Sequence, residues 1–150
     1  MYCTVDELIG MINPDAQNHI IGEGYNSDPE VRRRKLAALA EPALEDACSE
    51  VDGYLAKRYT VPLPQPPRIV VKYVKDIAVY NLFSRMGMVS GEREDNYRER
   101  YRDAIKFLTL AADGRVMLGV ADEQPGKQAQ IGFRLEGSPR LFNRDSMRGM

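Results

Sequence analysis

Apolar residues recur with the period of an α-helix in four stretches of the chain, and this pattern predicts the fold. The stretches are a short segment after residue 4 and three longer ones over about 42–58, 67–86 and 92–112. Residues within the three long stripes are expected to share one buried core: Leu44, Val51, Leu55, Ile77, Ile105 and Leu108. The pattern therefore predicts an all-α protein, a small helical bundle of about four helices.

Residues that start and stop helices divide these stretches. Residues 4–7 have the Thr-x-x-Glu form of a capping box, which starts the first helix. An Asn-Pro pair is expected to end that helix and to open a loop over 13–30, which is rich in glycine and polar residues. Pro42 predicts either a kink or the first turn of the main second helix. The proline-rich segment 61–67 predicts a rigid elbow, and Gly114 is suited to a left-handed helix end.

The stretch 67–86 is apolar over more of its circumference than the others. Such a helix is either central to a bundle or shared with a neighbouring subunit. The helical period then stops: residues 115–120 are expected to form a short strand or an extended segment, and 131–136 alternate as a half-buried strand does. We therefore predict a helical domain over 1–114 and an extended C-terminal arm over 115–150 that contains short strand-like segments. Such an arm is either disordered or ordered by a partner.

Composition and charge narrow the classes of partner. The 150 residues include 21 basic and 22 acidic side chains, a formal net charge of −1, which gives no electrostatic case for non-specific nucleic-acid binding. No apolar run approaches the ~20 residues of a membrane span, and the N-terminus lacks a signal-peptide pattern. We expect no membrane partner and a cytoplasmic location during synthesis. Cys3 and Cys48 lack neighbouring metal-ligand pairs and are expected to be reduced and packed.

No motif in the chain points to catalysis. The single histidine, His19, has no second catalytic or metal-ligating partner close in sequence. The glycine pairs at 22–24 and 87–91 lack the Lys-Ser/Thr ending of a phosphate-binding loop. Carboxylates over 45–50 lie where a surface helix places its charges. We therefore predict no catalytic residue, no metal site and no cofactor, and expect the protein not to be an enzyme.

The basic run Arg32-Arg33-Arg34-Lys35 leaves two interpretations open. Four consecutive charges point to all sides of a helix, which favours a solvated helix start whose cations face outward or pair with nearby carboxylates. If the run instead binds phosphates, the chain is a small helical DNA-binding or regulatory protein. DNA binding through several phosphates weakens steeply with salt, which distinguishes the two.

Tyrosines and the arm supply the candidate interface residues. A tyrosine ring with its polar tip suits a helix seam or a subunit interface. Six tyrosines lie on or near the long helices, and three are candidates for contacts between subunits: Tyr54, Tyr59 and Tyr80. The alternative is that all six belong to the core or its rim. In the arm, apolar and arginine residues are candidate anchors: Ile131, Phe133, Leu135, Arg140, Phe142, Arg144 and Arg148. The alternative there is a disordered end that binds nothing.

Several segments, taken in order and spacing, resemble the Mu-like phage neck family of small helical head–tail joining proteins. They are the N-terminal MYCTVDEL, the elbow region 50–68, KYVKDIAVYNL at 72–82, the helix and exit at 100–119, and the closing FNRDSMRG at 142–149. The resemblance covers most of the chain and is weakest over about 12–40 and 120–138.

The resemblance implies a structural adaptor that forms a ring between portal and tail and extends the DNA channel. It implies other copies of the chain as partners, about twelve in the virion, a number that follows from the portal symmetry of this class of joint. A ring uses heterologous contacts, so each copy must offer two different faces. It also implies the portal protein above, a tail-terminator or other neck protein below, and DNA that passes without sequence-specific contact. The location it implies is the virion neck, reached from the host cytoplasm. An enzyme with an unrecognised site is the remaining alternative.

Overall fold

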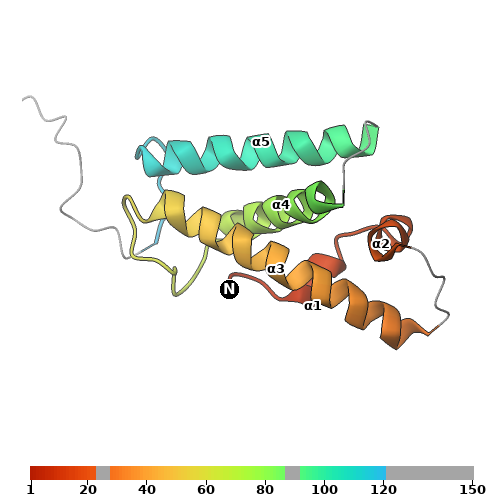
Figure 1. The fold of residues 1–150 in the computed structure, drawn as a ribbon. Coiled ribbons are helices and arrows are strands. Elements are labelled where there is room, and N and C mark those ends of the chain that lie inside the picture. The colour runs from red at the N-terminus through yellow and green to blue at the C-terminus, as the bar shows by residue number, and fades with distance from the viewer. Residues whose placement is uncertain (23–27, 87–91, 121–150) are drawn as a thin grey trace, which may run out of the picture.

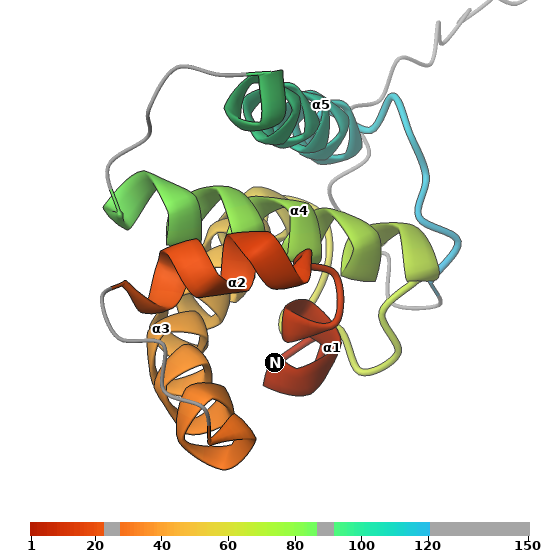
Figure 2. The same ribbon diagram turned by 90° about the vertical axis from the view of Figure 1, so that its right-hand side faces the viewer.

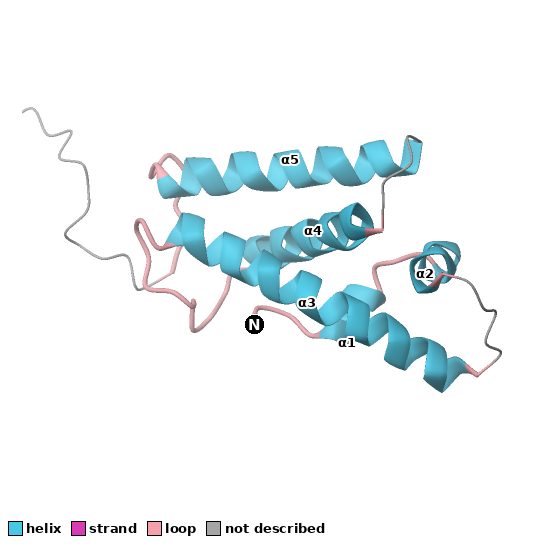
Figure 3. Cartoon of the chain, viewed as in Figure 1, coloured by secondary structure: helices cyan, strands magenta, loops and turns pink. Residues whose placement is uncertain are grey.

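Five α-helices form the part of the chain that the structure, a computed structural model, describes: residues 1–22, 28–86 and 92–120, with the backbone alone at 92–94. The helices are α1 (Val5–Ile9), α2 (Pro14–Ile21), α3 (Pro29–Leu55), α4 (Arg68–Arg85) and α5 (Glu92–Ala112). Within these ranges the chain contains no strand (Figure 3). The predicted all-α bundle is confirmed, with five helices where the pattern indicated about four.

The long helix α3 is the centre of the bundle. It packs against each of the other four helices, and α4 packs against both α3 and α5 (Figures 1 and 2). Five of the six predicted core residues are fully buried: Leu44, Val51, Leu55, Ile77 and Leu108. Ile105 is half-buried and packs at the rim, so its assignment to the interior was wrong.

Helix α2 corrects the loop that was expected over 13–30. Asn13 and Pro14 start this helix instead of ending the previous one. The Asn13 side chain accepts a hydrogen bond from the Asp15 N–H at 2.9 Å, and Pro14 occupies the first helical position, where its missing N–H does no harm. Ala16 and Ile20 are then buried against α3.

Helix α3 runs through Pro42 without interruption. Asp28 caps its start by accepting from the Glu30 N–H at 2.9 Å, and the helix ends at Leu55, three residues before the expected end. Pro42 is exposed, while buried residues continue on the opposite side before and after it. An interior proline costs about 3 kcal/mol, and core packing on both sides of it offsets that cost.

The capping box at the start of α1 is half formed. The Glu7 N–H donates to Thr4 Oγ1 at 3.2 Å as expected. The Glu7 carboxylate does not reach back to the helix start and instead pairs with Lys75 Nζ at 2.9 Å. A contact between α1 and α4 therefore replaces the second half of the local motif.

Two tyrosine hydroxyls hold the elbow and the exit from α5. Tyr2 donates to Asp52 and accepts from the Leu63 N–H at 3.1 Å, which fixes the elbow to α3. Tyr59 accepts from the Leu118 N–H at 3.2 Å. Gly114 has a φ of +74°, which confirms the left-handed end of α5. The segment 115–120 follows without forming the strand that was considered for it.

Candidate partner-binding surfaces

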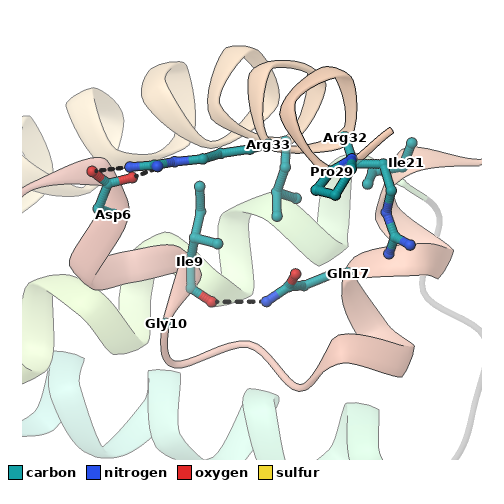
Figure 4. A pocket seen from close by; sticks show the side chains of 9 residues that line it. Asp6, Ile9, Gly10, Gln17, Ile21, Pro29, Arg32 and Arg33 are labelled. Carbon is teal, nitrogen blue, oxygen red and sulfur yellow. Dashed lines mark hydrogen bonds and ion pairs between the residues drawn. The ribbon is translucent and has the colours of Figure 1, made fainter. Parts of the chain in front are cut away.

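A cleft of about 510 Å³ lies between α1, α2 and the first turns of α3 (Figure 4). Its apolar lining includes Ile9, Ile21 and Leu36. The Gln17 amide donates to the carbonyl oxygens of Ile9 at 3.2 Å and Ile12 at 2.8 Å, which fixes the turn between α1 and α2. The cleft is therefore walled by elements that are tied to each other, and it is open to solvent.

The basic run lies at the rim of this cleft. Arg33 crosses one edge to pair with Asp6, with 2.8 Å between Nη2 and Oδ2 (Figure 4). Arg32 donates to the side-chain oxygen of Asn18 on α2. Arg34 and Lys35 are exposed. The expectation that these residues face outward or pair with carboxylates is confirmed for Arg33, Arg34 and Lys35, whereas Arg32 is half-buried and binds an amide oxygen.

The three candidate tyrosines are all at least half-buried. Tyr59 is only 2% exposed, which places its ring in the core rather than on a contact surface. Tyr80 is half-buried and stacks on Tyr101, with ring centroids 4.2 Å apart. Tyr54 is half-buried and packs on the core. The Tyr101 hydroxyl donates to Glu50 at 3.0 Å, and burial together with this hydrogen bond raises the pKa of Tyr101 to about 12.

A second hollow, of about 710 Å³, follows the elbow where the chain leaves α5. Its walls are the elbow residues 63–68 on one side and Leu118, Gly119 and Val120 on the other. The tyrosine hydrogen bonds described above fix both walls. The described chain therefore ends beside a preformed, largely apolar groove.

A carboxylate is buried between α4 and α5, and the sequence pattern did not predict its burial. Asp76 is 2% exposed, and its Oδ1 accepts from the Arg100 guanidinium. Lys72 Nζ lies 3.4 Å from Oδ2, which has no hydrogen-bond donor. The sequence signal was an acidic residue between Val74 and Ile77 on the helix with the widest apolar face.

The family described as Bacteriophage Mu, Gp36 matches residues 2–136 of the chain. The chain belongs to this family. It is similar to the Mu-like prophage FluMu protein gp36 of Haemophilus influenzae, with 31% identity over 121 residues and 81% of each chain covered. It is also similar to Gene product J of Escherichia phage Mu, with 27% identity over 108 residues that cover 71% of this chain and 72% of that protein.

The match to the Mu Gp36 family includes part of the arm. It reaches the candidate anchors Ile131, Phe133 and Leu135 and ends before four others: Arg140, Phe142, Arg144 and Arg148. All seven lie outside the described residues. Their role in partner binding stays a prediction.

The remaining candidate residues of this Mu Gp36 family member are one histidine and two cysteines. His19 is exposed in the last turn of α2 and not in a loop. Cys3 and Cys48 are free and buried, as expected, and burial raises the pKa of Cys3 to about 11. Among the described residues, no three His, Cys, Asp or Glu side chains gather in a way that could hold a metal ion. None of the described helices combines the length and apolarity that crossing a membrane requires.

Proposed function

We propose that the chain is a structural, non-enzymatic head–tail connector of a Mu-like phage. About twelve copies form a ring in the virion neck and extend the DNA channel, with the number taken from the cyclic symmetry of such a joint. The portal protein binds one side of the ring, and a tail-terminator or other neck protein binds the other. Membership of the Mu Gp36 family over residues 2–136 carries this proposal.

Two features of the described chain support a scaffold rather than a DNA-binding module. The helices pack around α3 into a body that leaves preformed hollows at its surface. Within the basic run, Arg33 is paired with Asp6 and Arg32 with Asn18, so the four cations do not form one patch directed at phosphates. DNA then passes through the ring without sequence-specific contact.

Deletion of this chain from an inducible prophage tests the proposal. Negative-stain images of the lysate are expected to show DNA-filled heads and separate tails, and a plasmid copy of the chain is expected to restore joined, infectious particles. Normal titres of joined particles from the deletion would overturn the connector role.

A DNA-binding measurement tests the alternative directly. The isolated chain is expected to bind duplex DNA weakly. The DNA-binding hypothesis would be favoured instead by tight binding that falls steeply with salt and is lost in a variant with alanine at all four positions of the basic run, Arg32, Arg33, Arg34 and Lys35.

A further inference from the structure

The first two turns of α4 carry a basic face with an apolar centre. Arg68, Lys72 and Lys75 line a shallow hollow of about 370 Å³ together with Val71 and with Met11, which follows α1. Met11 is 41% exposed. The three cations are spaced i, i+4 and i+7, which places them on one side of the helix, where like charges repel. These five residues are called the basic face below.

Carboxylates of the same chain neutralise the basic face only in part. Lys75 pairs with Glu7 at 2.9 Å, and Lys72 lies 3.4 Å from Asp76, a buried carboxylate that also binds a guanidinium of α5. Arg68 has no ion-pair partner within the described ranges. The first turn of α4 holds no acidic residue, although the positive end of a helix dipole favours one there. The basic face is therefore suited to a carboxylate supplied from outside the chain.

The middle of α3 presents a face of the opposite sign. Pro42, Glu45 and Ser49 are exposed along its centre, Glu41 is exposed at one edge, and Leu39 is 40% exposed at the other. Glu41 and Glu45 have no ion-pair partner among the residues that the structure describes. Because the side chains of Pro42 and Ser49 are short, a long arginine or lysine side chain can reach the carboxylates of Glu41 and Glu45. These five residues are called the acidic face below.

The two faces lie on different helices, and each lies on the solvent-exposed side of its helix. In Figure 2, the first turn of α4 is at the right, whereas α3 passes behind α4 and continues to the lower left. Two complementary patches of this kind on identical molecules make a heterologous contact, which repeats from copy to copy and closes into a ring when the rotation allows. An isologous dimer would instead bring each patch against itself, where like charges oppose association.

We propose that the basic face of one copy binds the acidic face of the next copy, with Arg68 directed at the carboxylates of Glu41 and Glu45. Apolar contact comes from Met11 and Val71 on one side and from Leu39 and Pro42 on the other. This interface rests on the proposed function, because it is the contact that propagates the connector ring.

Charge reversal in the prophage complementation assay tests the interface. Arg68→Glu or Glu45→Arg alone places like charges together in every contact of the ring, and each is expected to lower the phage titre about a hundredfold or more. The double variant restores opposite charges and is expected to recover titres to within about tenfold of wild type. Arg68→Glu does not threaten folding, because an acidic residue is favourable in the first turn of a helix.

Matched controls come from α5, where Glu99 and Arg102 are both exposed. Glu99→Arg and Arg102→Glu make the same changes of charge away from both faces, and their titres are expected to stay within about threefold of wild type. Single variants that behave like these controls would overturn the interface, and so would a double variant no better than the single variants.

Cross-linking gives a second, physical readout. The double variant Glu45→Cys/Arg68→Cys is expected to give a ladder of linked multimers in purified particles treated with a short bis-maleimide. A chain with only one of these two substitutions is expected to give none, because the native Cys3 and Cys48 are buried. Joined particles without a ladder would overturn the interface alone. Normal particles from the deletion strain would overturn the connector function itself, so the two failures are distinguishable.

Discussion

Asp76 on α4 and Arg100 on α5 form the most deeply buried ion pair in the described part of the chain. The Asp76 side chain has no exposed surface, and the Arg100 side chain is 34% exposed. A buried ion pair of this kind is weak evidence for stability, because desolvation of the charges offsets their attraction. Removal of Arg100 alone is nevertheless costly, since it leaves the Asp76 carboxylate buried between α4 and α5 without its guanidinium partner.

Arg100→Ala is therefore expected to lower the free energy of unfolding by about 2–3 kcal/mol. This is below the ~3–5 kcal/mol for breaking a fully buried pair, because Lys72 remains 3.4 Å from the carboxylate. The double variant Asp76→Asn/Arg100→Met is expected to be more stable than Arg100→Ala. Lys72→Ala serves as the control, with a loss under about 1 kcal/mol because Lys72 is exposed. Urea midpoints measure all three, and an unchanged midpoint for Arg100→Ala would contradict the prediction.

Two glycines are expected to respond to alanine in opposite directions. Gly53 lies in α3, and a Cβ there would meet no atom within 4 Å apart from the adjoining backbone of its own helix, so Gly53→Ala should stabilise the protein by about 0.5–1 kcal/mol. Gly114 has a φ of +74°, and a Cβ there would overlap the Arg58 guanidinium. Gly114→Ala should destabilise by about 1–2 kcal/mol. Thermal unfolding compares the pair, and shifts of the same sign would refute the assignment.

The cysteines provide a test of burial and of pH dependence. Both thiols are expected to resist Ellman's reagent at pH 8 in the folded protein and to react as two equivalents in urea, because both are buried. Burial raises the pKa of Cys3 to about 11. An unfolded thiol ionises near pH ~8.5. The stability that Cys3 contributes is therefore complete below pH ~8.5 and declines as pH rises toward 11.

Cys3→Ala isolates this contribution. The variant is expected to lose less stability than the wild type between pH 9 and pH 11, since it lacks the buried thiol that must stay protonated. Identical alkaline profiles of urea midpoints would show that Cys3 does not contribute. Rapid labelling of the native protein at pH 8 would show that the thiols are not buried.

The sequence pattern predicted the buried residues correctly where a helix has a single apolar side. The stripe of α3 predicted Leu44, Val51 and Leu55 correctly, because a helix with a single apolar side buries that side. The sequence-based prediction was wrong where one local signal is compatible with two structures. An Asn-Pro pair can end one helix or cap the next, and Pro42 can start a helix or lie exposed within one. Packing against a second element decides between these alternatives, and a single stretch of sequence contains no information about that packing.

The candidate surfaces were predictable only in part, for a related reason. The basic run was visible in the sequence, but its partners Asp6 and Asn18 lie on other helices. Asp76 could not be recognised as buried until α5 placed Arg100 beside it. Sequence spacing places residues on one helix face, whereas ion pairs between helices depend on how the helices pack.

Truncation of the arm is the decisive test of how the chain is divided. A chain that ends at Val120 retains Leu118, which is buried and whose N–H bonds to Tyr59. We expect this chain to be soluble, helical and cooperative in unfolding, but unable to join heads to tails, because it lacks the anchors from Ile131 to Arg148. A chain that ends at Gly114 is the matched control. It also loses the Leu118 contact and is expected to unfold at lower urea than the longer chain. Equal stability of the two would place the boundary at residue 114, and normal particle assembly by the longer one would show that the arm has no role in joining.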